Sequence, residues 1–293
     1  MSHPENLDLS LGFVLEKSHI RGRLVRLHHV VNNIISKHAY PYKIGHLLAE
    51  LIVAAVGLRS LLKFEGIFTL QTKGRGPIQL AVVDVTSDGN TRGYVQYDEA
   101  QLTGSKSQNL AHLLGTGYLA FIVDPLKGRD RYEGLVELTE DDLSANLEYY
   151  FEQSEQLESR VRIAVDYEDG KWNATALILQ KMPEKDMSPE EEEEAWNHID
   201  ALLRTLGRQE FLDFSHEPET LLFRLFHELE LSLFPPTHFQ AKCRCDRERI
   251  QSFLSSLAPE EIEEFVINNQ IDVTCEFCNH TYVFERKDVH TLH

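Results

Sequence analysis

Two short stretches near the end of the chain, Cys243-Arg244-Cys245 and Cys275-Glu276-Phe277-Cys278, contain all four cysteines of its 293 residues. Four thiolates, two from each of two short turns, are the ligand set of a tetrahedral Zn²⁺ site, with sulfur about 2.3 Å from the metal. The first pair is unusual, because zinc knuckles normally separate their cysteines by about two to four residues. We predict one Zn²⁺ per chain, bound by Cys243, Cys245, Cys275 and Cys278.

The start of the chain and its longest apolar stretch indicate a cytoplasmic protein. Residues 1–10, MSHPENLDLS, lack the basic and apolar segments of a signal peptide. The stretch from Ile44 to Leu62 contains charged residues, and its leucines and alanines repeat at helical spacing, which predicts a core helix instead of a membrane span. Cytoplasmic cysteines are reduced at rest, so zinc binding or catalysis is favoured over permanent disulfides.

The first part of the chain has the pattern of an α+β fold. Short β-branched runs follow one another in groups, bounded by turn residues, which favours a mainly antiparallel sheet domain. The expected strands are Ile20–Val25, Phe64–Gln71, Ile78–Val85, Arg92–Tyr97, Tyr118–Val123, Tyr132–Leu138, Val161–Tyr167 and Trp172–Gln180. Helices are expected around residues 28–38, 44–62 and 141–157.

The composition changes after Met182-Pro183. Residues 184–194, EKDMSPEEEEE, hold seven acidic residues and one lysine, and Ser188-Pro189 is typical of a helix start. Residues 185–237 carry −9 of the net charge of −18. Large apolar residues follow at helical spacing and need a surface to pack on, although two ordinary docked helices would give the same pattern. The residues concerned are Trp196, Ile199, Leu202, Leu203, Leu206, Phe211, Leu212, Phe214, Leu221, Leu222, Leu225, Phe226 and Leu229.

Three parts follow from these patterns: an α+β core domain at 1–183, an acidic and partly helical linker at 184–237, and a small C-terminal zinc-binding module at 238–293. Within the module we expect helices near 246–257 and 260–268, strands at 271–274 and 281–285, and a left-handed Asn279 behind the second knuckle. The module is not basic overall, which argues against a nucleic-acid zinc ribbon. Four cations near its start either offset the charge of a four-thiolate centre or form an ordinary solvated helix face: Lys242, Arg244, Arg247 and Arg249.

Motifs of catalysis are missing from the sequence, so we expect no enzyme. Residues 115–120, GTGYLA, resemble a dinucleotide turn, but a helical run precedes them and a strand follows, which is the reverse of the required order. His227 is expected to be a packed or capping residue. His238 and His280 flank the cysteines, but four thiolates already complete a tetrahedron.

Seven segments spread along the sequence belong together as a pattern: Gly74-x-Gly76-Pro77, Gly115-x-Gly117-Tyr118, Arg131-Tyr132-x-Gly134, Tyr150-Phe151-x-x-Ser154-Glu155-Gln156-Leu157, Leu225-Phe226-His227-Glu228, Cys243-x-Cys245-x-Arg247-Glu248-Arg249 and Cys275-x-x-Cys278. Through these segments the whole chain, from near residue 10 to its end, resembles the redox-regulated holdase chaperones of the thirty-three-kilodalton heat-shock family. Two positions depart from the family pattern: Asp246 replaces a small hydroxyl residue, and Leu229 interrupts an acidic run.

The resemblance implies an ATP-independent chaperone that oxidative stress activates. In the reduced, zinc-bound form it is inactive. Oxidation of the thiolates releases zinc, the C-terminal module and linker lose structure, and exposed apolar surface captures unfolding client proteins. We expect disulfides Cys243–Cys245 and Cys275–Cys278, because neighbours in sequence stay close after the metal leaves. The expected partners are unfolding proteins and, as an option for the oxidised form, a second copy of the chain, with no nucleic acid and no membrane.

Two other classes stay open on the residues alone. One is an enzyme in which the four-cysteine site is purely structural, which turnover of a small substrate would reveal. The other is a zinc-containing adaptor for nucleic acid or a protein partner, which salt-dependent binding with zinc in place would reveal.

Overall fold

The computed structural model describes residues 7–104, 109–127, 130–182 and 187–286. The chain forms two compact units, Met1–Ala241 and Lys242–His293. The expected boundary between residues 183 and 184 lies outside the described residues. Residues 237–241, around the expected end of the linker, pair with strands of the first unit. The division into three parts remains a prediction.

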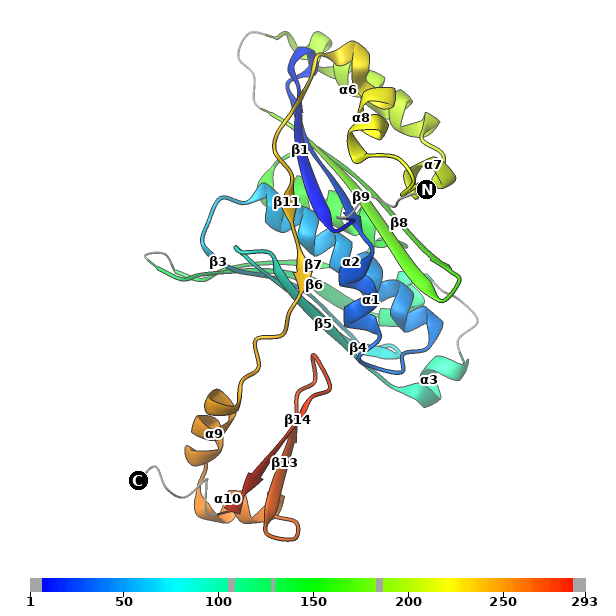
Figure 1. Ribbon diagram of the computed structural model, residues 1–293. Coiled ribbons are helices and arrows are strands. Elements are labelled where there is room, and N and C mark those ends of the chain that lie inside the picture. Colours follow the sequence, from blue (N-terminus) through cyan, green and yellow to red (C-terminus); the bar gives the residue numbers. More distant parts are fainter. Residues whose placement is uncertain (1–6, 105–108, 128–129, 183–186, 287–293) are drawn as a thin grey trace. The chain divides into compact units, whose positions relative to one another are not determined.

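The first unit contains two sheets (Figure 1). The first sheet has the order β10-β1-β2-β9-β8, with β11 also paired to β1. Its strands are β10 (Leu231–Leu233), β1 (Leu9–Leu15), β2 (Ile20–Leu27), β9 (Lys171–Lys181), β8 (Ser159–Glu168) and β11 (Thr237–His238). The second sheet has the order β12-β5-β4-β3-β6-β7. Its strands are β12 (Gln240–Ala241), β5 (Asn90–Tyr97), β4 (Ile78–Thr86), β3 (Gly66–Gly74), β6 (Gly117–Pro125) and β7 (Tyr132–Glu137).

Strand pairing confirms the expected α+β class with mainly antiparallel sheets, since among the described strands only β12 and β5 pair in parallel. All eight expected strands are present. Strand β1 was missed, although Leu9, Leu11, Phe13 and Leu15 alternate with smaller residues in the way that marks a strand. Strands β10, β11 and β12 have two or three residues each, too few for a period-2 pattern.

Helix α2 (Tyr42–Leu61) lies between the two sheets and forms the centre of the main core. By length and composition it could cross a membrane, but 72% of its apolar window is buried inside the unit, as expected for a core helix. Gly57 lets the helix approach β9 closely, because a Cβ there would lie 2.7 Å from Ile178 Cδ1. The same layer contains α1 (His29–Ile35), and α5 (Leu143–Tyr150) packs on β8.

Helices α6 (Pro189–Thr205), α7 (Arg208–Phe211) and α8 (Pro218–Phe226) cover the other face of the first sheet (Figure 1). The start of α6 confirms the predicted signal: Glu191 N–H donates to Ser188 Oγ, and Ser188 N–H donates to Glu191 Oε2. The remaining elements of the first unit are α3 (Glu99–Gly104), α4 (Leu110–Leu114), a π-helix (Phe151–Glu155) that continues α5, and 3₁₀ turns at Glu16–Ser18 and His227–Leu229.

The second unit consists of α9 (Arg247–Ser255), α10 (Pro259–Phe265) and the antiparallel pair β13 (Gln270–Thr274) and β14 (Thr281–Glu285). These four elements match the expected ones. Among the described residues its core contains only four buried apolar side chains, Leu254, Ile262, Ile271 and Phe284. Such a small core leaves most of the stability of the unit to another source.

Candidate functional site

The first cysteine pair directly precedes helix α9. Asp246 occupies the N-cap of this helix, where its side chain accepts a hydrogen bond of 2.7 Å from Arg249 N–H. An aspartate at this position satisfies an otherwise unpaired backbone N–H and complements the helix dipole. The departure from the family pattern at residue 246 therefore keeps the capping function, and it fixes the direction in which the chain leaves Cys245.

The second cysteine pair forms the turn between β13 and β14. Cys275 N–H donates to His280 O at 2.9 Å, and Asn279 N–H donates to Cys275 O at 2.8 Å. Asn279 has φ = 57°, which confirms the predicted left-handed residue behind the knuckle. This turn reverses the chain within a few residues, so Cys275 and Cys278 lie close together.

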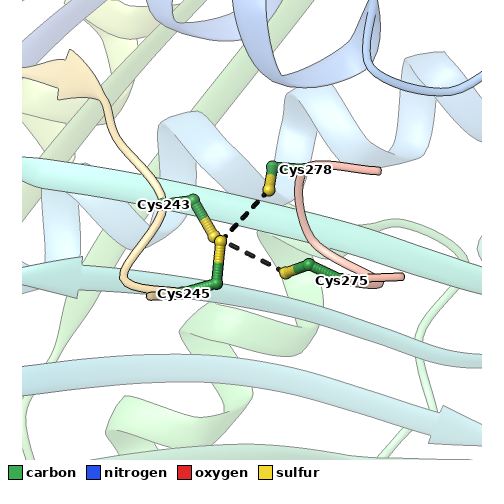
Figure 2. Close-up of side chains that lie close together, drawn as sticks. All are labelled: Cys243, Cys245, Cys275 and Cys278. Carbon is green, nitrogen blue, oxygen red and sulfur yellow. Dashed lines mark hydrogen bonds between the residues drawn. The ribbon is translucent and has the colours of Figure 1, made fainter. Parts of the chain in front are cut away.

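The four sulfur atoms converge from these two segments (Figure 2). Cys243 Sγ lies 3.7 Å from Cys275 Sγ, and Cys245 Sγ lies 3.4 Å from Cys278 Sγ. All four lie within 4.8 Å of one another, and none of the four cysteines forms a disulfide. In a tetrahedron with metal–sulfur bonds of about 2.3 Å, neighbouring sulfurs are roughly 3.8 Å apart. The residues therefore fit a four-coordinate metal ion.

The surroundings of the sulfurs oppose ionisation unless a cation is near. Burial raises the pKa of the Cys245 and Cys278 thiols. The Tyr282 hydroxyl donates to Cys245 Sγ at 3.3 Å, which by itself lowers the pKa of Cys245, but burial has the larger effect; the same hydrogen bond raises the pKa of Tyr282 to about 12. Because clustered thiolates repel one another in a partly buried site, a divalent cation is the group that would make the ionised form stable.

Neither flanking histidine belongs to this cluster, which among the described residues consists of the four cysteines. The ring of His280 packs against Tyr282, with centroids 4.5 Å apart. His238 lies on β11 of the first unit. His227 Nδ1 lies 3.1 Å from Phe223 O at the end of α8, which agrees with the expected capping role. The glycine segment at 115–120 forms the expected helix stop and turn between α4 and β6, with Gly115 at φ = 62°.

The apolar residues of the linker pack on the first sheet. Phe226 is fully buried and stacks on Phe13 of β1, with ring centroids 5.7 Å apart. Trp196, Leu206, Phe211 and Leu222 belong to the same buried cluster, with Leu202 partly buried at its edge. The expectation that these residues need a surface to pack on is confirmed, and that surface is the outer face of β1, β2, β8 and β9.

Basic side chains of the first sheet hold the acidic linker, a feature that sequence reasoning missed. Arg160 of β8 forms a bidentate pair with Asp200 of α6, at 2.7 and 2.9 Å, and its guanidinium lies 4.9 Å from the Trp196 ring centre. Lys181 Nζ lies 2.9 Å from a Glu192 carboxylate oxygen. Buried Arg26 donates to His216 O at 2.6 Å. The strand sequences did not indicate these contacts with the linker, because arginines alternating with apolar residues are typical of any half-exposed strand.

Comparisons with known proteins cover both units. The family model described as Hsp33 protein matches residues 8–285. A protein of Pseudomonas syringae pv. syringae (strain B728a), named 33 kDa chaperonin, is 37% identical over 290 residues, which span 98% of this chain and 94% of the relative. A protein of the same name from Aeromonas salmonicida (strain A449) is 34% identical over 288 residues, which span 98% and 95%.

A solved structure is similar along its whole length. The crystal structure of the 33 kDa chaperonin (heat shock protein 33 homolog) of Thermotoga maritima matches with a TM-score of 0.83 and 25% identity, over 97% of both chains. Sheets, linker helices and a four-cysteine unit together define a class of chaperone with a C-terminal cysteine site. The chain belongs to the Hsp33 family.

Proposed function

We propose that this protein is an ATP-independent holdase chaperone that oxidation switches on in the cytoplasm. The observation that carries the proposal is the clustering of four sulfurs within 4.8 Å in a unit with only four buried apolar side chains among its described residues. Such a unit would depend on its metal for folding, so the chemistry of the sulfurs would decide whether the unit stays folded. Its partners are unfolding proteins.

In the inactive form, Cys243, Cys245, Cys275 and Cys278 would bind one Zn²⁺ as thiolates. The bound ion would supply the positive charge that keeps all four sulfurs ionised. Zinc is favoured over other metals because four thiolates in a tetrahedron are its usual structural site. Asp246 at the start of α9 and the Asn279 turn would hold the two knuckles in place.

Oxidation would act on the sulfurs themselves. Each pair of thiolates would give two electrons to the oxidant and form one disulfide, and the oxidised sulfurs would no longer bind the metal. In the folded unit, sulfur contacts join the two knuckles, at 3.7 Å between Cys243 and Cys275 and at 3.4 Å between Cys245 and Cys278. We still propose bridges Cys243–Cys245 and Cys275–Cys278, because the unit would unfold as the metal is lost and local loops then close at the lowest entropy cost.

The linker would be the element that responds. It precedes the first knuckle in the chain, and its docking combines apolar burial with a small set of ion pairs. Once the cysteine unit has unfolded, release of α6–α8 would expose the apolar face of the first sheet, including Phe13 and Leu24. Large exposed apolar patches are typical of protein-binding surfaces, and unfolded clients present matching apolar segments.

An aggregation assay tests this proposal. A chemically denatured client is diluted into buffer with reduced, zinc-loaded protein or with oxidised, metal-free protein, and light scattering is recorded. We expect suppression near one chain per client for the oxidised form only, and a return to the inactive state after reduction with zinc present. Equal suppression by both forms would contradict the switch. Suppression by neither form, together with salt-dependent nucleic-acid binding or turnover of a small substrate, would favour the adaptor or the enzyme.

A further inference from the structure

Two segments quoted for the family resemblance take no part in the cysteine site or the linker. They are Arg131-Tyr132-x-Gly134 and the stretch from Tyr150 to Leu157. In the first unit both reach the wall of one cavity of about 460 Å³, to which they contribute Tyr132, Tyr150, Phe151, Glu155 and Leu157. This volume is within the range of small-molecule sites.

The cavity lies beyond the C-terminal end of α2. The end of this helix contributes Leu58 and Leu61 to the lining, and both sheets contribute further residues. Phe68 of β3 and Phe121 of β6 line the cavity from the second sheet, whereas Arg21 of β2 and Gln180 of β9 line it from the first. Most of the remaining wall is apolar, with Leu58, Leu61, Leu62, Phe64 and Val123.

One wall of the cavity contains a π-helix and two closely stacked aromatic rings. The Tyr150 ring lies directly on Phe121, and the space that it occupies exists only because residue 134 is glycine: a Cβ there would lie 2.6 Å from the Tyr150 hydroxyl. That hydroxyl donates to Glu155 Oε1 at 2.9 Å, and Tyr132 donates to the same oxygen at 3.1 Å. The π-helix at Phe151–Glu155 places this carboxylate, and π-helical turns are frequent at functional sites.

Arg21 is a positively charged group of the cavity wall. Its Nε and Nη2 donate to Gln180 Oε1 at 3.1 and 2.8 Å, and no carboxylate of the described residues forms an ion pair with it. Burial lowers the pKa of Arg21, but a guanidinium stays charged in proteins. The cavity wall thus contains a partly desolvated positive charge with donors to spare, which a carboxylate could bind with two hydrogen bonds. Two exposed residues add one charge of each sign to the lining, Lys63 and Asp130.

We propose that this cavity binds an amphipathic carboxylate, of which a medium-chain fatty acid is the simplest example. The carboxylate would pair with the guanidinium of Arg21, and the alkyl chain would lie among Phe68, Phe121 and Leu58. A cationic amphiphile is disfavoured because Glu155 already accepts two hydroxyl hydrogen bonds and Asp130, the other carboxylate of the lining, is exposed to solvent. The proposal is independent of the redox switch, since none of these residues belongs to the cysteine unit or to α6–α8.

The first experiment uses the unchanged protein. Decanoate and decylammonium, which share chain length and differ in charge, are titrated below micellar concentrations into the reduced, zinc-loaded full chain, and heat is recorded. We expect saturable binding of one decanoate per chain, at least about tenfold tighter than any binding of decylammonium. Absence of saturable decanoate binding, or equal or tighter binding of decylammonium, would overturn the proposal whatever the variants do.

The second experiment separates Arg21 from its neighbour. Arg21→Gln should weaken decanoate binding about tenfold or more and change decanol binding less than about twofold. The matched control is Arg23→Gln, on the same strand and also half-buried, whose Nε donates to Ser60 O at 3.0 Å and which does not line the cavity. This variant should bind decanoate and decanol as tightly as the natural protein does. If Arg21→Gln binds decanoate as the natural protein does, or if both variants lose it equally, the Arg21 site is wrong.

Discussion

The two units of the chain are stabilised in different ways. The first unit has a continuous apolar core around α2 and a second buried cluster beneath α6–α8. The second has four buried apolar side chains among its described residues and four clustered sulfurs. Ordering a backbone opposes folding by about 1–2 kcal/mol per residue, which four side chains cannot offset. We therefore expect chemistry at the sulfurs to unfold the second unit while the core around α2 stays folded.

The largest expected effect comes from removing metal ligands. In a Cys245→Ser, Cys278→Ser double variant we expect bound zinc to fall from about one per chain to near zero. Residues 242–293 should then exchange their amide hydrogens rapidly, because metal binding contributes on the order of 10–16 kcal/mol to the folding of small zinc modules. Exchange at α2 should stay slow. Metal analysis measures the bound zinc, and hydrogen exchange measures the loss of structure in the second unit. Full zinc occupancy in the variant would refute the ligand assignment.

The next effect concerns the apolar docking of the linker. Phe226→Asp removes a fully buried ring that stacks on Phe13 and places a charge in its site, at a cost of about 3–5 kcal/mol. We expect this variant to suppress client aggregation while reduced and zinc-loaded, and to be cut by protease near Met187.

The matched control is Phe223→Asp on the same helix, because the Phe223 side chain is 64% exposed. It should behave like the natural protein in both assays. If Phe226→Asp keeps its zinc and shows the new cleavage but holds no client, the linker does not gate the client site.

A smaller effect is expected from the ionic part of the docking. Arg160→Gln and Asp200→Asn should each weaken the docking of α6 on the first sheet. A double-mutant cycle in the free energy of unfolding should give a coupling energy of about 1 kcal/mol between the two side chains, because the pair is bidentate but partly exposed. A higher salt concentration should reduce this coupling energy. The exposed pair Lys17–Glu230, treated in the same way, should show no measurable coupling. Equal couplings would mean that the Arg160–Asp200 pair has no special role in docking.

A pH dependence of stability is expected within the first unit. Burial raises the pKa of Glu50 from 4.5 to about 7, with a further increase from the Asp142 charge and an opposing effect of Arg208. Between these values the folded state keeps a proton that the unfolded state releases, so stability falls as pH rises from about 4.5 to 7. Burial lowers the pKa of nearby His46 from 6.5, which has the opposite sign and acts below that pH.

Glu50→Gln removes this dependence. At pH 8 the variant should be more stable than the natural protein by roughly 1–3 kcal/mol, and the difference should shrink at pH 5. Urea unfolding followed through the first unit at both pH values measures it. A difference that is the same at both values would show that Glu50 does not titrate in this range.

Local patterns in the sequence predicted much of this molecule. Eight strands and the main helices follow from periodicity and turn residues, and the start of α6 follows from Ser188-Pro189. Strand β1 carried a readable alternation of Leu9, Leu11, Phe13 and Leu15 that was missed. The short strands β10–β12 have no readable pattern in the sequence, because their pairing with β1 and β5 is a contact between residues far apart in the chain.

The sequence by itself determined the candidate metal site, because ligand chemistry depends on which residues are present and four cysteines in two close pairs leave few alternatives. Only the tertiary structure decided what the arginines do. Arg160 pairs with Asp200, whereas Arg21 lines a cavity and has no carboxylate partner in the part of the chain that the structure describes, yet both have the sequence pattern of ordinary strand residues. The reason is that the role of a charged side chain depends on its surroundings, and those surroundings come from segments far apart in the chain, as Arg21 and Gln180 show with a separation of 159.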